Sequence, residues 1–151
     1  MDFFETLPTL YELIITGITL LICTITDIKK REINLWACFG LMIAAAIEPN
    51  KDFSMSFVSA ALGFIPLFVI ARFGQGGDGD ALLMGALGFT LPLLYFLYLY
   101  FVTSILYAVV LGAIIIIKKE NRKKKVLLYA PFVTGAWIIM VILLATGVYG
   151  V

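Results

Sequence analysis

Two aspartates stand where apolar and polar segments meet, and their type and position favour acid–base chemistry. Asp27 abuts the end of the first apolar segment, and Asp80 opens the fourth after a glycine-rich stretch. An ionisable group costs about 2.5–3.5 kcal/mol at the bilayer centre and less near helix ends, so its presence there indicates function. Two carboxyl groups held close together share one proton, because both cannot ionise easily. One can then withdraw a proton from water while the other protonates a leaving amine.

Simpler interpretations remain open for both positions. In one, Asp27 is a solvated charge beside the membrane. In another, Asp78 and Asp80 only stabilise the N-terminus of a helix that follows a flexible loop. Asp78 is also an alternative to Asp80 as the second carboxylate. The sequence does not decide which aspartate holds the proton, because a coupled pair titrates as one unit.

The residue types that are missing exclude other chemistries. The chain has no histidine, which excludes Ser–His and Cys–His nucleophile pairs, HExxH zinc peptidases and haem bound by histidine. The two cysteines, Cys23 and Cys38, are too few for a zinc tetrad. Both lie in apolar stretches, where we expect them to be small buried hydrophobes. We therefore expect neither a metal ion nor a cofactor.

The composition indicates which elements must position the aspartates. Of the 151 residues, 62% are hydrophobic and 14% are charged, and the mean hydropathy is +1.06. A soluble domain carries roughly 25% charged residues, so this chain cannot cover a surface in water and belongs in lipid. Apolar blocks alternate with polar segments: residues 10–26, 33–47, 53–73, 81–117 and 126–148.

One of these blocks is too long for a single span. A bilayer core of about 30 Å needs roughly 20 helical residues, and residues 81–117 exceed that length. Pro92 divides the block, because proline removes a backbone donor and disfavours helix in the preceding residue. The pattern therefore predicts an all-α, polytopic membrane protein with six transmembrane helices, in a single domain that covers residues 1–151.

The positive charges indicate how the chain lies in the membrane. With six spans, ten of the eleven lysines and arginines fall on one side, in residues 29–31, Arg72 and residues 118–125, and only Lys51 lies opposite. The positive-inside rule makes these loops cytoplasmic and both termini external, in the cell membrane, with the aspartates near the cytoplasmic face. Residues 118–125 are a topology determinant attracted to anionic lipid or, alternatively, a contact for an acidic partner.

The glycines before Asp80 have a conformational role. Gly77 and Gly79 allow positive φ and close backbone approach. The segment can therefore turn tightly or admit an extended substrate strand, and we expect these two glycines to contribute to substrate binding. Such irregular backbone is tolerated at membrane depth when it is buried in protein or lines a wet cavity.

Three segments together resemble those of one family of membrane peptidases. Residues 27–34 (Asp-Ile-Lys-Lys-Arg-Glu-Ile-Asn) look like a first aspartate motif after an apolar helix, and residues 77–80 (Gly-Asp-Gly-Asp) match a GxGD motif. Small residues follow at 81–88, and residues 130–132 (Ala-Pro-Phe) are similar to a late Pro-Phe segment. This combination resembles the type IV prepilin peptidases, and the first motif is most similar to that of the archaeal preflagellin peptidases.

The resemblance implies a membrane aspartic endopeptidase that acts without a cofactor. Asp27 and Asp80 would be the catalytic dyad, and Gly77 and Gly79 would shape the approach to it. The substrates would be prepilin- or preflagellin-like precursors, whose short basic leaders are removed at the cytoplasmic face. Bacterial members that also N-methylate the product carry a cysteine-rich region, which this chain lacks, so we expect no methyltransferase activity and no S-adenosylmethionine site. Apart from precursors, we expect membrane lipid and no nucleic acid as partners, and the oligomeric state is left open.

The chain departs from the family pattern at two positions. Leu82 stands where the family often has lysine, and Asn34 where it often has proline. Both departures bear on how substrate is positioned. A hypothesis of another class is a non-enzymatic transporter or assembly subunit whose intramembrane aspartates bind cations or protons. A small transporter is expected to show inverted repeats with broken helices, and the sequence has none.

Overall fold

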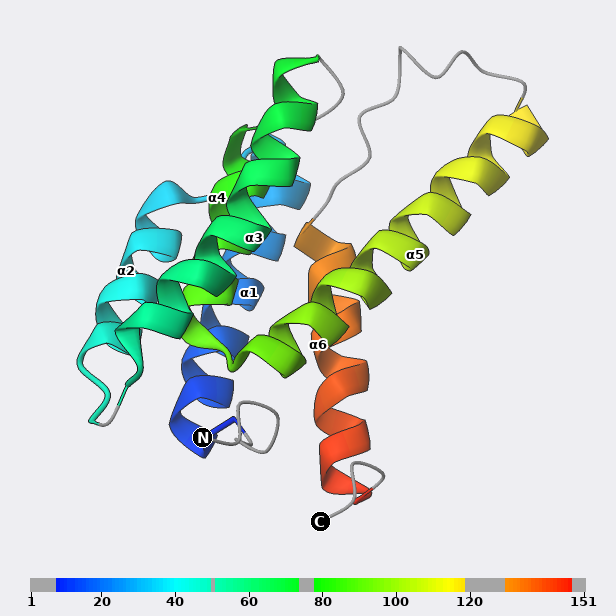
Figure 1. The fold of residues 1–151 in the computed structure, drawn as a ribbon. Helices are drawn as coiled ribbons and strands as arrows, with labels where there is room; N and C mark the ends of the chain where they lie inside the picture. Colours follow the sequence, from blue (N-terminus) through cyan, green and yellow to red (C-terminus); the bar gives the residue numbers. More distant parts are fainter. Residues whose placement is uncertain (1–7, 50, 74–77, 119–129, 148–151) are drawn as a thin grey trace.

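The computed structural model describes residues 8–49, 51–73, 78–118 and 130–147, which form α-helices and no strand (Figure 1). The predicted all-α fold is therefore confirmed for these residues. Gly77 and residues 119–125 lie outside the described part of the chain. The helices described are α1 (Leu10–Lys30), α2 (Leu35–Ala46), α3 (Phe53–Arg72), α4 (Asp78–Thr90), α5 (Leu93–Lys118) and α6 (Ala130–Ala145).

The helices differ in whether they can cross a bilayer. Within the described residues, α1, α3 and α5 are long and apolar enough to do so, whereas α2 and α6 are shorter apolar helices. The helix α4 has 13 residues and is therefore about 20 Å long. The expected number of helices is found, but six complete spans and external termini stay predictions.

Two helix boundaries show how individual residues determine where a helix begins or ends. The break at Pro92 is confirmed, because α4 ends at Thr90 and α5 begins at Leu93. The first apolar block ends at residue 26, whereas α1 continues to Lys30, so the charged residues after the block extend the helix. Basic side chains in a last turn complement the helix dipole, and Arg31 closes α1 with φ 55° and an N–H that donates to the Asp27 carbonyl.

The centre of the bundle is α4, which contacts α1, α2, α3 and α5. Its residues from Leu83 to Thr90 are all buried. Glycines let α3 and α4 approach closely: a Cβ added at Gly88 would lie 2.4 Å from the Ser59 carbonyl oxygen, and one at Gly63 would lie 2.6 Å from the Met84 carbonyl oxygen. Small residues at such crossings are typical of helices that pack in membranes.

Gly88→Ala tests this packing. The new methyl group meets backbone rather than a flexible side chain, so we expect the free energy of unfolding in detergent to fall by about 1–3 kcal/mol. Gly112→Ala on α5 is the matched control, because nothing lies within 4 Å of its added Cβ. The control should be neutral or slightly stabilising, since alanine favours helix over glycine by about 1 kcal/mol. Equal effects of the two variants would contradict the close α3–α4 contact.

A buried polar network joins α1 to α4 at the end of the bundle opposite the two aspartates. Lys51 Nζ lies 2.8 Å from Glu12 Oε1 and 3.9 Å from Glu48 Oε2, and it donates to the carbonyl oxygen of Thr90. The Thr9 hydroxyl donates to Glu48 Oε1 at 2.7 Å. Lys51 is the one lysine that the positive-inside pattern places opposite the other basic residues. These contacts explain its position there, because its charge is paired.

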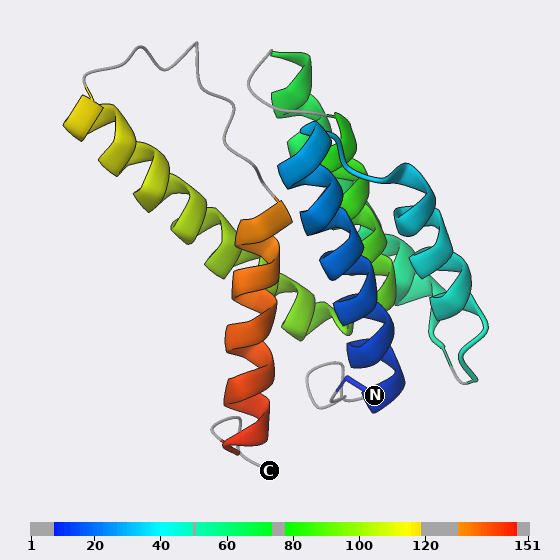
Figure 2. The same cartoon turned by 180° about the vertical axis from the view of Figure 1, so that it is seen from behind.

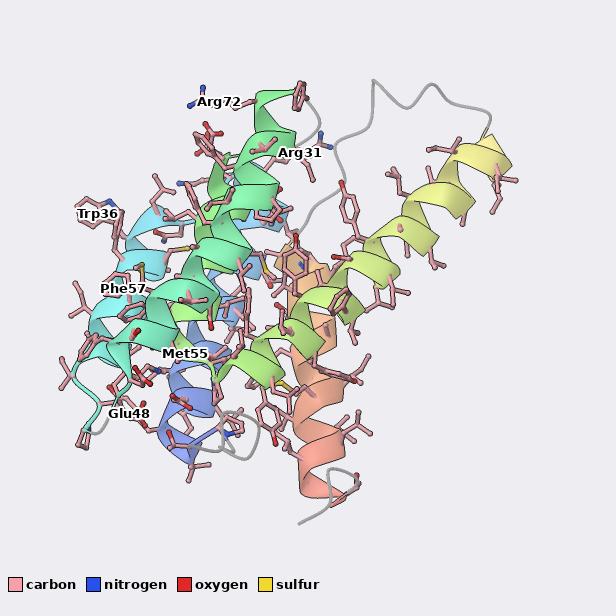
Figure 3. The ribbon with its side chains drawn as sticks, viewed as in Figure 1. Arg31, Trp36, Glu48, Met55, Phe57 and Arg72 are labelled. Carbon is pink, nitrogen blue, oxygen red and sulfur yellow. The ribbon has the colours of Figure 1, made fainter. Side chains whose placement is uncertain are left out.

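Charged side chains lie at both ends of the molecule. Arg31 and Arg72 lie at one end of the molecule and Glu48 at the other, and Trp36 and Phe57 point outward from the bundle (Figure 3). Trp36 is 85% exposed at the start of α2, where an amphipathic ring suits the membrane interface. The end marked by the two arginines is the one that holds Asp27 and Asp80.

Candidate active site

Asp27 lies on the buried face of α1, in the last turns of that helix. Its exposed fraction is 5%, so its interpretation as a solvated charge beside the membrane is wrong. Its Oδ2 atom accepts a hydrogen bond of 3.1 Å from the backbone N–H of Ala130, the first residue of α6. A carboxylate and a helix N-terminus attract each other, because the unpaired N–H groups there carry partial positive charge.

The helix α6 therefore belongs to the surroundings of Asp27. It packs beside α1, as the views from both sides show (Figure 1, Figure 2). A second hydrogen bond joins these helices at 2.7 Å, between the hydroxyl groups of Thr24 and Thr134. Pro131 occupies the second position of α6, which agrees with its expected place at a helix start.

The two cysteines lie close to Asp27. Cys23 is one helical turn before it on the same face of α1, and Cys38 belongs to α2. Both side chains are fully buried and neither is in a disulfide. The prediction that they are small buried groups of the core is confirmed.

Asp80 lies in the first turn of α4 and is partly buried, whereas Asp78 is exposed. Between them, Gly79 packs against the segment that joins α1 to α2, because a Cβ added there would lie 3.1 Å from Ile33 Cβ. The close approach expected at Gly79 is thus made to a neighbouring part of the chain. Lys51 joins the far ends of α1 and α4, so these helices run in opposite directions with Asp27 and Asp80 at the same end of the bundle.

Asp80 is set back from the end of α3. The contacts of Gly88 with Ser59 and of Gly63 with Met84 define an antiparallel register between α3 and α4. Continued toward the N-terminus of α4, this register places Asp80 level with Leu67. Leu67 lies five residues before Arg72, the last residue of α3, which corresponds to about 8 Å along the helix axis. Asp80 therefore lies about 8 Å below the end of α3 along the helix axis.

A side chain that the sequence did not indicate completes this end of the bundle. Tyr107 of α5 packs its ring against Phe132 of α6, with centroids 5.5 Å apart and an interplanar angle of 80°. The Tyr107 side chain is partly buried. Tyr107 lies in a long apolar block, so no feature of the sequence distinguishes it from a lipid-facing residue.

The hydrogen bond between Ala130 and Asp27 can be removed without removing a side chain. Ala130→Pro deletes the N–H donor, and proline is well tolerated at a helix start. Hydrogen bonds to charged groups are worth about 1.5–3 kcal/mol, so we expect any activity that depends on Asp27 to fall by about 10- to 100-fold. Thr134→Val is the control, because it removes the other α1–α6 side-chain hydrogen bond and leaves the Asp27 donor in place. The prediction fails if the control loses as much activity as Ala130→Pro.

The described helices, three of them long and apolar enough to cross a membrane, are those of a helical membrane protein, and two of them bring carboxyl groups to one end of the bundle. Comparison with protein families narrows this class. The model of the type IV leader peptidase family matches residues 14–117, about two thirds of the chain, and includes both Asp27 and Asp80. The chain belongs to this family, whose members are membrane peptidases. Comparisons with curated proteins and with solved structures give no match.

The family match and the structure cover different parts of the site. The matched residues end at 117, so α6 lies beyond them. The hydrogen bond from Ala130 to Asp27 and the contact of Phe132 with Tyr107 are therefore contributions to the site that only the structure provides.

Proposed function

We propose that the protein is an aspartic endopeptidase that removes the short basic leader of prepilin- or preflagellin-like precursors at the cytoplasmic face of the membrane. The family match supports leader peptidase activity. The burial of Asp27 supports the assignment further, because an ionisable group buried among apolar helices is costly to keep and therefore indicates a function.

The mechanism uses Asp27 and Asp80 as a general acid–base pair. The ionised carboxylate takes a proton from a water molecule as the water oxygen attacks the carbonyl carbon of the scissile peptide bond. The protonated carboxyl group then gives its proton to the leaving nitrogen as the C–N bond breaks. The pair ends with the proton on the opposite partner, and exchange with solvent restores the starting state.

The position of Asp80 suits a substrate that enters as an extended strand. A peptide must leave its helical conformation to expose its carbonyl carbon, and Asp80 is set back from the end of α3. We propose that Gly77 and Gly79 contribute backbone to the path that the strand follows, as the resemblance implies. We also propose a single peptidase domain over residues 1–151, without methyltransferase activity.

A cleavage assay tests the proposal. The purified protein is reconstituted into vesicles with prepilin- and preflagellin-type precursors, and the loss of the leader is followed by mass spectrometry. We expect a mature product with one new N-terminus and no added methyl group when S-adenosylmethionine is supplied. If protein with intact helix content shortens no precursor, the peptidase proposal is contradicted, and the alternative of a transporter or assembly subunit gains support.

A further inference from the structure

The segment that joins α1 to α2 is short and is fixed at both ends. At its start, the Arg31 N–H donates to the Asp27 carbonyl oxygen at 2.8 Å, and the left-handed backbone of Arg31 ends α1. At its end, the Asn34 side chain accepts a hydrogen bond of 3.2 Å from the N–H of Ala37 and caps α2. The residues between these two caps therefore keep a fixed position relative to the turn of α1 that carries Asp27.

Ile33 is the apolar side chain of this segment that packs against the protein. It is partly buried and contacts the hydrophobic core, whereas Arg31 and Glu32 are exposed. Its neighbour on α4 is Gly79, where an added Cβ would lie 3.1 Å from Ile33 Cβ and 3.7 Å from Ile33 Cγ1. Carbon atoms in ordinary contact are about 3.5–4.0 Å apart. Ile33 therefore occupies the space that a side chain at position 79 would need.

This contact links the two proposed catalytic groups. Gly79 directly precedes Asp80 in the first turn of α4, and Ile33 follows Asp27 through the segment that the caps hold in place. A close-packed contact transmits displacement, because protein interiors compress little. A change in the separation of Ile33 and Gly79 therefore changes the separation of the two carboxyl groups.

We propose that Ile33 is a positioning residue, whose packing against Gly79 sets the spacing of the catalytic dyad. The inference rests on the proposed function, because this spacing matters only if the two carboxyl groups transfer protons. It assigns the small size of residue 79 to a contact within the protein, and not only to the path of a substrate strand. The two roles predict different kinetics, since the spacing of the dyad acts on kcat, whereas an obstructed path acts on KM.

Gly79→Ala tests the inference. The added methyl group meets Ile33 Cβ, which its own backbone fixes and which cannot rotate away, so the two segments must separate by about 0.4–0.9 Å. A misplacement of 1 Å can cost about 100-fold in rate. We therefore expect kcat for leader cleavage in the vesicle assay to fall by about tenfold, with KM within about twofold of the wild-type value.

A second substitution distinguishes a direct contact from other effects of the new methyl group. Ile33→Gly alone should lower kcat by about tenfold, because the space between the two segments is no longer filled. In the Gly79→Ala background it removes the overlapping Cβ, so we expect it to raise kcat instead. Ile33→Val is the matched control, because valine keeps the Cβ. It should leave kcat within about twofold of wild type and give no recovery with Gly79→Ala.

A further control and the wild-type protein decide between the possible failures. Glu32→Gly also places glycine in this segment, but at an exposed position, and it should not restore Gly79→Ala. The inference is overturned if Gly79→Ala keeps wild-type kcat or raises KM alone, or if Ile33→Gly restores it no better than Glu32→Gly does. If Gly79→Ala lacks the helix content of the wild type, equal kcat in Ile33→Gly and Ile33→Val overturns the inference. A wild-type protein that cuts no precursor contradicts the proposed function instead, so the two failures are distinguishable.

Discussion

Asp27→Asn and Asp80→Asn are each expected to lower kcat for leader cleavage by at least about 10²- to 10⁴-fold, the usual contribution of a general acid or base. An amide neither takes a proton from water nor donates one to a leaving amine, so either change removes one half of the mechanism. In the Asp27→Asn variant, the side-chain amide retains a carbonyl oxygen that can accept the hydrogen bond from Ala130. We therefore expect the fold around this position to survive the substitution.

The controls for this prediction come from the same end of the bundle. Asp78→Asn changes a carboxyl group two residues from Asp80, but Asp78 is exposed and its loss should leave kcat almost unchanged. The double variant Asp27→Asn, Asp80→Asn should be no less active than the less active of the two single variants. Residues that act as a unit do not contribute additively. Near-wild-type cleavage by either single variant would show that the dyad is wrongly assigned.

Lys51→Met has the largest expected effect on stability. The side chains of Lys51 and Glu12 are each 7% exposed and their charged atoms are 2.8 Å apart. Removal of one partner leaves a buried carboxylate unpaired, which typically lowers the free energy of unfolding by about 3–5 kcal/mol. The change also removes the donor to the Thr90 carbonyl oxygen at the end of α4. Unfolding in mixed detergent, followed by circular dichroism, measures the loss.

A second substitution distinguishes an unpaired charge from lost packing. The double variant Glu12→Gln, Lys51→Met replaces both charges and should recover most of the stability, because a buried pair and a neutral replacement are often equivalent. Glu32→Gln is the control, since Glu32 is exposed and surface charges contribute about 0–1 kcal/mol. If the double variant is as unstable as Lys51→Met alone, unpaired charge is not the cause.

The sequence predicts the features that depend on composition and on single residues. Apolar blocks locate the helices, and Pro92 locates the break between α4 and α5, because proline acts on its own neighbours wherever it lies in a helix. The apolar block does not locate the end of α1, since the charged residues after position 26 continue the helix to Lys30. Block length also does not distinguish a span from a shorter core helix such as α4.

The contacts that complete the candidate site could not be predicted, because they join residues far apart in the chain. Glu12 and Lys51 are separated by 39 positions, and Asp27 and Ala130 by 103. Ala130 belongs to a segment that resembles one of the family. Its hydrogen bond to Asp27 comes from the backbone N–H, so the identity of the residue does not reveal it. Tyr107 could not be predicted for the same reason, since only the packing of α5 on α6 distinguishes it from other aromatic residues.

The short helices of this protein bear on the lipid around it. A bilayer core is about 30 Å thick, whereas α2, with 12 residues, and the described part of α6, with 16 residues, extend about 18 Å and 24 Å. Both helices expose large apolar side chains, such as Phe39 and Ile142, which we expect lipid tails to cover. Such hydrophobic mismatch is relieved by local thinning of the bilayer, which costs fractions of a kcal/mol per ångström. A thinned bilayer beside α2 and α6 brings headgroups and water closer to the level of Asp80, so the rate of leader removal should depend on acyl-chain length.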